Sequence, residues 1–245
     1  MVIMILEVLC LAILTVFVSA VEFIAGFGIS TIMIPVLMLF ISPVHAIFFT
    51  SVIDLVHNFF KMWIVRKKPI SWYLVFRFGT SAVIATSIGA LLIFLIPEIL
   101  FQQLIGLLLL VYVWFLNFNP EFHVPSNTLS VVAAGGIYGF ISGMFGIGGV
   151  LRTAILIAFN LSKETYLATH SITSLLVSIT RFGTYISQGA QLSTTLLFAL
   201  IACIPLTFIG VFVGRILFSR ISPKQLRLII SFLLSLMGLK FLLIH

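Results

Sequence analysis

Apolar residues fill this chain in ten runs, separated by short breaks that contain glycine, proline or polar residues. The runs of the first half cover residues 3–25, 28–41, 44–65, 71–96 and 99–117, and those of the second half cover residues 128–145, 147–160, 164–187, 191–218 and 224–244. A helix needs roughly 20 consecutive apolar residues to cross a bilayer, and all but the second run of each half approach or exceed that length. The pattern predicts an all-α polytopic membrane protein.

The second run of each half is shorter than the others. Residues 28–41 and 147–160 number about 14 each, which is roughly 21 Å of helix at 1.5 Å per residue. Glycines, which weaken a helix because they retain backbone freedom, stand at the start of both runs: Gly26, Gly28, Gly146, Gly148 and Gly149. We expect the first two runs of each half to form either a re-entrant, broken-helix hairpin or two short, tilted spans.

The two halves match each other when the chain is shifted by 120 residues. The shift places Gly26 on Gly146, Gly28 on Gly148, Ser42 on Ser162, Thr50-Ser51 on His170-Ser171 and Lys61 on Arg181. We therefore expect a duplication, which is common among transporters, with residues 1–117 as the first transmembrane repeat, 118–127 as a cytoplasmic linker and 128–245 as the second repeat. Because five segments are an odd number, consecutive repeats would be inverted relative to each other.

Charge is scarce and unevenly distributed. Only 8% of the residues are charged, against about 25% in soluble domains, and the mean hydropathy is +1.32. Lys and Arg gather in the turns at 66–70 and 219–225, whereas the turns at 42–43, 97–98 and 188–191 have none. Because basic turns face the cytoplasm, the net charge of +7 indicates orientation rather than nucleic-acid binding. We expect a multi-pass protein of the cell membrane whose partners are the lipid bilayer and a small solute.

The glycine breaks are candidates for an anion site. A helix N-terminus presents unpaired N–H groups and a partial positive charge, so a helix that begins inside the membrane can bind an anion there. The residues at the two breaks are Gly26, Gly28, Ser30 and Thr31, then Gly146, Gly148, Gly149 and Arg152. Tight helix packing is the alternative, and we favour it for Gly135, Gly136, Gly139 and Gly143, most of which are four residues apart.

Charged residues inside apolar runs form a second group of candidates. A charge at mid-membrane costs at least about 2.5 kcal/mol on insertion scales, so it needs a partner or a cavity. Arg152 either pairs with Glu22 or Asp54 or contacts an anionic substrate, whereas Arg181 either acts at the substrate or a gate or forms a structural pair. Glu22, Asp54 and His57 either couple ion flow to transport or neutralise a cation.

Polar residues also follow the third run of each half. Thr50, Ser51 and Asn58 in the first half and His170 and Ser171 in the second are candidates to line a path through the membrane. Serine and threonine can instead hydrogen-bond to their own helix. The histidines are too few and too scattered to predict a metal site, and no enzyme motif or cofactor signature is present.

Two sets of residues resemble a known family. Ala25-Gly-Phe-Gly28, Pro35, Asn58, Lys61 and Trp72 resemble the first repeat of the TauE/SafE sulfite-exporter family, and Gly143-Met-Phe-Gly-Ile-Gly-Gly149, Ala168-Thr169 and Arg181 resemble its second repeat. The resemblance implies a multispanning transporter of small anions, chiefly sulfite and organosulfur compounds such as sulfonates. The first repeat lacks the glycine triplet common in the family. Arg152 follows the second cluster, where a proline often comes, and the resemblance assigns it no role.

The sequence features predict a secondary transporter of a small anion by alternating access, and the resemblance implies export of a sulfur-containing anion. The anion would lie between the two broken-helix tips. A passive anion channel and a non-transport membrane scaffold are the alternatives, and the sequence does not determine the oligomeric state or the coupling ion.

Overall fold

A computed structural model describes residues 2–25, 28–118, 127–217 and 223–243, and these ranges contain helices and turns without a strand. The helices of the first half are α1 (Val2–Ala25), α2 (Ile29–Leu37), α3 (Pro43–Val65), a continuous rod made of α4 (Trp72–Leu74), η1 (Val75–Gly79), α5 (Thr80–Leu92) and η2 (Ile93–Leu95), and α6 (Glu98–Phe118). Those of the second half are α7 (Thr128–Phe145), α8 (Gly149–Ile157), α9 (Lys163–Ser187), α10 (Thr194–Leu217) and α11 (Pro223–Leu243). The predicted all-helical class is confirmed.

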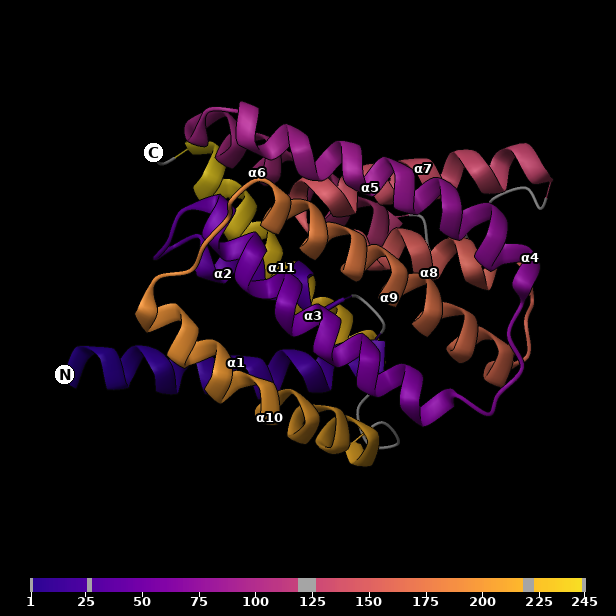
Figure 1. Cartoon of the computed structure of the whole chain (residues 1–245), viewed down its shortest axis with the longest axis horizontal. Coiled ribbons are helices and arrows are strands. Elements are labelled where there is room, and N and C mark those ends of the chain that lie inside the picture. The colour runs from indigo at the N-terminus through magenta and orange to yellow at the C-terminus, as the bar shows by residue number, and fades with distance from the viewer. Residues whose placement is uncertain (1, 26–27, 119–126, 218–222, 244–245) are drawn as a thin grey trace.

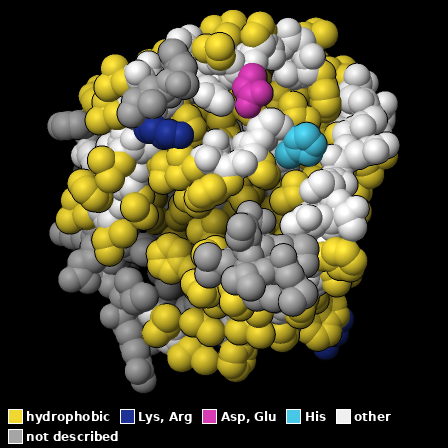
Figure 2. Space-filling model, turned by 90° about the vertical axis from the view of Figure 1, so that its left-hand side faces the viewer, with side chains coloured by type: hydrophobic (Ala, Val, Ile, Leu, Met, Phe, Trp, Pro, Cys, Tyr) yellow, Lys and Arg dark blue, Asp and Glu magenta, His cyan; other side chains and the backbone are white. Residues whose placement is uncertain are grey.

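Several helices are long enough to cross a membrane. Within the described ranges, five have the required length and apolar composition: Pro43–Val65, Trp72–Leu95, Glu98–Phe115, Thr128–Phe145 and Thr194–Leu217. Shorter apolar stretches lie in α1 and α11, and α9 is long enough but richer in polar residues. Large apolar side chains are exposed along these helices, and Figure 2 shows an end of the molecule where hydrophobic side chains predominate and charged ones are sparse. Such a surface suits contact with lipid.

The helices α2 and α8 are shorter than the sequence predicts. Each has nine residues, which is about 14 Å of helix and less than half of the roughly 30 Å hydrocarbon core. Gly146 ends α7 in the left-handed conformation with φ 71°, a typical glycine C-cap, and Gly28 precedes α2 with φ 85°. Both positions therefore favour glycine, because a side chain would strain these backbone angles.

The main helices of each half pack most extensively against helices of the other half. The helix α1 packs against α10, and α5 packs against α7; α3 contacts α9, and α6 contacts α11. Exchanging the two halves converts the first pair into the second and leaves the other two pairs unchanged. Ser42 and Ser162, which the 120-residue shift aligns, are the N-cap residues of α3 and α9. The beginning of α1 and the end of α11 lie at the same end of the molecule (Figure 1).

Glycine allows α7 to approach the α4–α5 rod closely. A methyl group at Gly135, Gly139 or Gly143 would lie between 2.1 and 2.4 Å from a backbone carbonyl oxygen of η1 or α5. A methyl group at Gly136 would meet nothing within 4 Å. The packing interpretation is therefore confirmed for three of the four glycines and is wrong for Gly136, which lies on the other face of α7.

Candidate functional site

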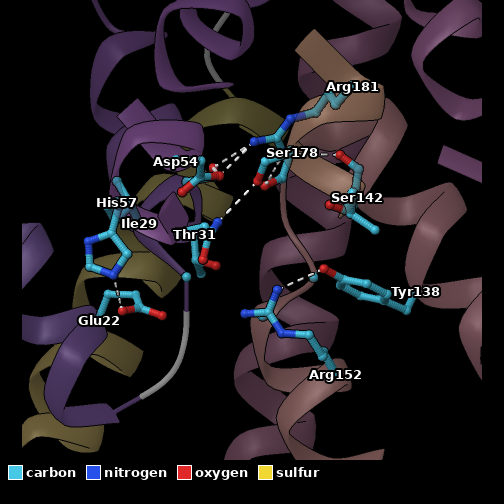
Figure 3. A pocket seen from close by; sticks show the side chains of 17 residues that line it. Glu22, Ile29, Thr31, Asp54, His57, Tyr138, Ser142, Arg152, Ser178 and Arg181 are labelled. Carbon is cyan, nitrogen blue, oxygen red and sulfur yellow. Dashed lines mark hydrogen bonds and ion pairs between the residues drawn. The ribbon is translucent and has the colours of Figure 1, made fainter. Parts of the chain in front are cut away.

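A small polar cavity lies where the first turns of α2 and α8 meet. Figure 3 shows that the first half of the chain contributes one wall and the second half contributes the other. The lining residues are Glu22, Gly28, Ile29, Ser30, Thr31, Asp54, His57 and Asn58 on one side and Tyr138, Ser142, Gly146, Gly148, Gly149, Arg152, Val177, Ser178 and Arg181 on the other. The centre of a water-sized sphere can move through about 20 Å³, which is room for roughly one water molecule.

The two helix tips touch each other through glycine. A methyl group on Gly28 would lie 3.6 Å from the Cα atom of Gly149, an ordinary contact distance, so the two tips lie close together at these glycines. The helical bonds of the first turns begin with the Thr31 N–H donating to the Gly28 carbonyl (3.3 Å) and the Arg152 N–H donating to the Gly148 carbonyl (3.1 Å). Earlier N–H groups of a helix have no acceptor within it. Gly26, the remaining glycine of the predicted site, lies outside the described residues.

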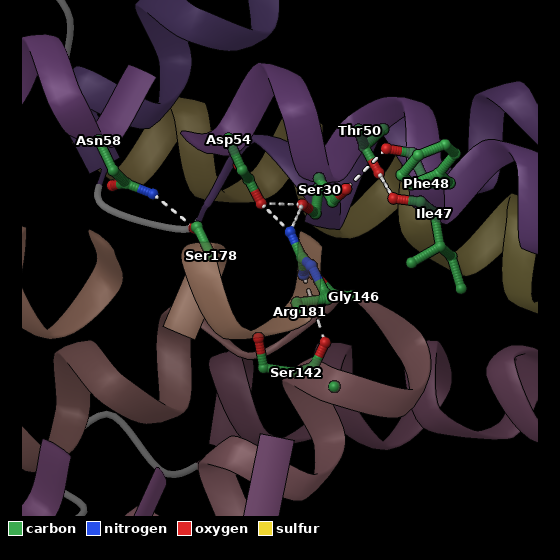
Figure 4. A network of polar contacts seen from close by, with 12 residues as sticks. Ser30, Ile47, Phe48, Thr50, Asp54, Asn58, Ser142, Gly146, Ser178 and Arg181 are labelled. Atoms are coloured by element: carbon green, nitrogen blue, oxygen red, sulfur yellow. Dashed lines mark hydrogen bonds and ion pairs between the residues drawn. The ribbon is translucent and has the colours of Figure 1, made fainter. Parts of the chain in front are cut away.

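Arg181 joins the two halves of the chain. It is 1% exposed, and its Nη2 donates to Asp54 Oδ2 at 2.6 Å. Its Nη1 donates to the carbonyl oxygens of Gly146 (3.1 Å) and Ser142 (3.3 Å) at the end of α7. The Ser30 hydroxyl donates to the same Asp54 oxygen, and Figure 4 shows the guanidinium at the centre of this network. Arg181 thus neutralises Asp54 and satisfies helix-terminal carbonyls.

Glu22 belongs to a second buried ionic cluster. The Lys61 ammonium donates to Glu22 Oε1 at 2.9 Å, and His57 Nε2 lies 2.5 Å from Glu22 Oε2. All three side chains are at most 6% exposed. Lys61 and Arg181, which the 120-residue shift aligns, therefore each contact the end of the first helix of their own half. A structural ion pair, one of the two predicted roles, is what the geometry shows for Glu22.

Arg152 is buried without an acidic partner. It is 5% exposed, its Nε donates to His170 Nε2 at 3.1 Å, and its Nη1 donates to the Tyr138 hydroxyl at 2.8 Å. Within the described part of the chain, no carboxylate lies within 4.0 Å of its guanidinium. The predicted alternative of a salt bridge to Glu22 or Asp54 is therefore wrong, because other cations already occupy both acids.

Equivalent positions of the two halves meet beside the ionic clusters. Asn58 Nδ2 donates to Ser178 Oγ at 3.1 Å, and these residues are 120 positions apart. Ser142 is likewise 120 positions from Glu22. Ser178 belongs to the polar face predicted for residues 164–187, whereas Ser142 was not among the predicted site residues, although the repeat shift could have identified it. Tyr138 aligns with Val18, so no sequence signal pointed to it.

The structure separates the predicted site residues into two groups. Those that line the cavity are Gly28, Ser30, Thr31, Asn58, Gly146, Gly148, Gly149, Arg152, Arg181, Glu22, Asp54 and His57. Thr50, Ser51 and Ser171 lie outside it and donate their hydroxyl groups to carbonyls of their own helices, which is the alternative expected for such residues. His170 also lies outside the lining but contacts Arg152.

Comparison with known proteins identifies the family of this chain. A family model described as sulfite exporter TauE/SafE matches residues 11–241. No curated protein and no solved structure matches the chain. The match includes both glycine breaks and every residue that lines the cavity. The family consists of membrane transporters associated with sulfite and related sulfur anions rather than enzymes. This multi-pass membrane protein belongs to the TauE/SafE sulfite exporter family.

Proposed function

We propose that this protein is a secondary transporter that exports a small sulfur-containing anion, such as sulfite or an organosulfonate. The anion binds between the tips of α2 and α8. The observation that carries the proposal is Arg152, a buried cation at this cavity with no carboxylate partner among the described residues. An unpaired charge inside a membrane protein is costly and generally marks a substrate or ion pathway.

The surroundings of Arg152 suit an oxyanion. Each helix N-terminus contributes roughly half a positive charge, and two of them face the cavity. A guanidinium group presents donors in a planar fork that matches sulfur oxyanions as it matches carboxylate and phosphate. A metal-dependent site has no comparable support, because the described residues contain no group of three or more His, Cys, Asp or Glu that could hold a metal ion.

The duplication expected from the sequence also forms part of the proposal. We infer that residues 1–117 and 128–245 are inverted repeats joined by a cytoplasmic linker at 118–127. The helix pairs that interchange when the halves are exchanged support this layout, as does the Asn58–Ser178 hydrogen bond between equivalent positions. Single cysteines at Lys67 and Glu98 should react with impermeant reagents from opposite sides of the membrane. Reaction of both from one side would contradict the inverted arrangement.

We infer two entrances to the site, at opposite ends of α3 and α9, and they differ in a way that supports alternating access. Near the start of α3 and the α9–α10 turn, a hollow of about 310 Å³ is lined by residues that include Val44 and Gln188. The 120-residue shift aligns these with Glu164 and Lys68, which form an ion pair of 2.5 Å at the other end of α3 and α9. One entrance therefore contains a hollow, whereas the Lys68–Glu164 ion pair spans the equivalent entrance. The distribution of basic turns favours an external position for the hollow.

An aromatic cluster lies beside the hollow. Phe48 and Phe94 line the hollow and contact Tyr185 with ring-centroid distances of 6.3 and 5.7 Å. The Tyr185 hydroxyl donates to the Gly143 carbonyl at 2.8 Å. Tyr185 lies one helical turn after Arg181 in α9. Because the cavity itself holds roughly one water molecule, a sulfur oxyanion requires the tips to separate. We infer that the structure resembles a closed state of the transport cycle.

Flux measurements test the proposal. Purified protein in proteoliposomes should release ³⁵S-labelled sulfite or a labelled sulfonate faster than empty vesicles, with saturation at high substrate concentration. The inside-negative potential assists anion export by about 2.3 kcal/mol per charge per 100 mV. Wild-type flux no greater than that of empty vesicles for every sulfur anion tried would refute the proposal. Flux that never saturates and is accompanied by conductance would indicate a channel instead.

A further inference from the structure

We propose that the central site selects monoanions over dianions of the same shape, and that Arg152 supplies the charge that the monoanion neutralises. This inference rests on the proposed function and adds the charge class of the substrate. It follows from a count of ionised groups around the cavity and from the hydrogen bonds that determine the charge of the neighbouring histidines.

Three cations face two carboxylates around the site. Glu22 is paired with Lys61 at 2.9 Å, and Asp54 is paired with Arg181 at 2.6 Å. Arg152 on α8 is the cation left over within the described residues. The buried site therefore carries one uncompensated positive charge when the histidines are neutral.

Hydrogen bonding indicates that both histidines are neutral. His170 Nε2 faces the N–H of Arg152 Nε at 3.1 Å, so this ring nitrogen accepts and carries no proton. His57 Nε2 donates to Glu22, and its Nδ1 is buried with no partner in the described structure. A second proton on His57 would create a buried, unsatisfied N–H donor.

A monoanion between the helix tips therefore makes the occupied site neutral. A dianion leaves one uncompensated negative charge in an enclosed, poorly solvated place, which is unfavourable. Sulfate and methanesulfonate separate this effect from shape, because both are tetrahedral at sulfur but carry two charges and one charge. Sulfite provides a second comparison, since it exchanges between its dianion and the hydrogen sulfite monoanion near neutral pH.

The first experiment uses the wild-type protein in proteoliposomes. We expect ³⁵S-methanesulfonate efflux at least about tenfold faster than ³⁵S-sulfate efflux, the ratio that corresponds to about 1.4 kcal/mol. Efflux of a fixed total sulfite concentration should fall between about pH 6 and about pH 8, because hydrogen sulfite loses its proton there, whereas carboxyl, lysine and arginine side chains in water titrate outside that range. Methanesulfonate efflux, measured at the same pH values, corrects for titration of Glu22, His57, His170 and the other groups around the site.

Charge-changing variants provide the second experiment. Arg152→Gln should lower methanesulfonate efflux at least about tenfold, whereas the matched variant Arg152→Lys, which keeps the charge but loses the planar fork, should preserve the wild-type ratio of methanesulfonate to sulfate efflux. Glu22→Gln leaves the site with two uncompensated positive charges and should raise the sulfate-to-methanesulfonate efflux ratio at least about tenfold. Thermal unfolding in detergent identifies variants that fail to fold. If a variant fails to fold, the ratio of methanesulfonate to sulfate efflux in the wild-type protein still tests the charge proposal.

The outcomes distinguish the charge proposal from the proposed function. Sulfate efflux as fast as methanesulfonate efflux in the wild type would overturn the charge proposal while leaving sulfur-anion transport intact. An unchanged efflux ratio in a folded Glu22→Gln protein would also overturn it. No efflux of any sulfur anion would overturn the proposed function itself.

Discussion

Replacing Gly28 by alanine tests whether transport depends on the backbone path at the tip of α2. Gly28 has φ 85° and ψ 136°, a conformation that L-residues rarely adopt and that costs them about 1–3 kcal/mol. The new methyl group would lie 3.6 Å from Gly149 Cα, an ordinary contact distance. The free energy of unfolding should therefore fall by about 1–3 kcal/mol through backbone strain rather than through a clash.

The effect on transport should exceed the effect on folding. The methyl group stands between the two tips, where we place the anion, and relief of the strain displaces the first N–H groups of α2. We expect efflux of a sulfur anion to fall about tenfold or more, which corresponds to a loss of about 1.4 kcal/mol or more in the stabilisation of the bound anion. The measurements are ³⁵S efflux from proteoliposomes and thermal unfolding in detergent.

Two other glycines serve as controls. Gly136→Ala adds a methyl group with nothing within 4 Å in a helix interior, where alanine is more stable than glycine by about 0.5–1 kcal/mol; transport should be unchanged. Gly139→Ala places a methyl group 2.1 Å from the Ala82 carbonyl oxygen, so stability should fall by about 1–3 kcal/mol or more. If Gly28→Ala transports as well as Gly136→Ala, the tip of α2 does not form the anion site.

Three further predictions concern the polar contacts. Asp54→Asn or Arg181→Gln alone should lower the free energy of unfolding by about 3–5 kcal/mol because each leaves a buried charge unpaired, and the double variant should recover part of this loss in a double-mutant cycle; strict additivity would contradict direct pairing. Lys68→Glu or Glu164→Lys should expose the inner entrance to a cysteine reagent, and the charge-swapped double variant should restore protection, with a coupling of about 0.2–1 kcal/mol because the pair is exposed. Tyr138→Phe removes the phenol oxygen that accepts from the unpaired guanidinium and should raise the substrate KM without loss of folding; an unchanged KM would argue against a role for this hydroxyl.

Much of the fold could be predicted from the pattern of apolar residues. Helical class follows from long apolar runs, because a membrane leaves few other ways to satisfy the backbone. The breaks at Gly28 and Gly146 were predicted because glycine reports backbone conformation locally, and the 120-residue shift identified Lys61 and Arg181 as counterparts. The lengths of α2 and α8 were overestimated because the apolar pattern continues past Leu37 and Ile157, where the helices end.

The composition of the site depended more strongly on packing. Thr50 and Ser171 have the polarity expected of a path-lining residue, but their hydroxyls donate to their own helices, and only the rotation of α3 and α9 determines which face meets the cavity. Tyr138 lies on α7 next to Gly139, one of the glycines in close contact with the α4–α5 rod, and its hydroxyl accepts from Arg152. No local pattern distinguishes such a tyrosine from a packing residue.

The sequence by itself determined the helical membrane class and the two glycine breaks, and it predicted the duplication, because these depend on residue periodicity, composition and backbone freedom. Tertiary structure decided which acid neutralises which cation, because that depends on distances between α1, α3 and α9 that are remote in the chain. Glu22 lies beside Lys61 and His57, and Asp54 lies beside Arg181. Only this pairing reveals that the charge of Arg152 is left without a carboxylate in the described structure, and its physical consequence is a buried site with a positive charge available for an anion.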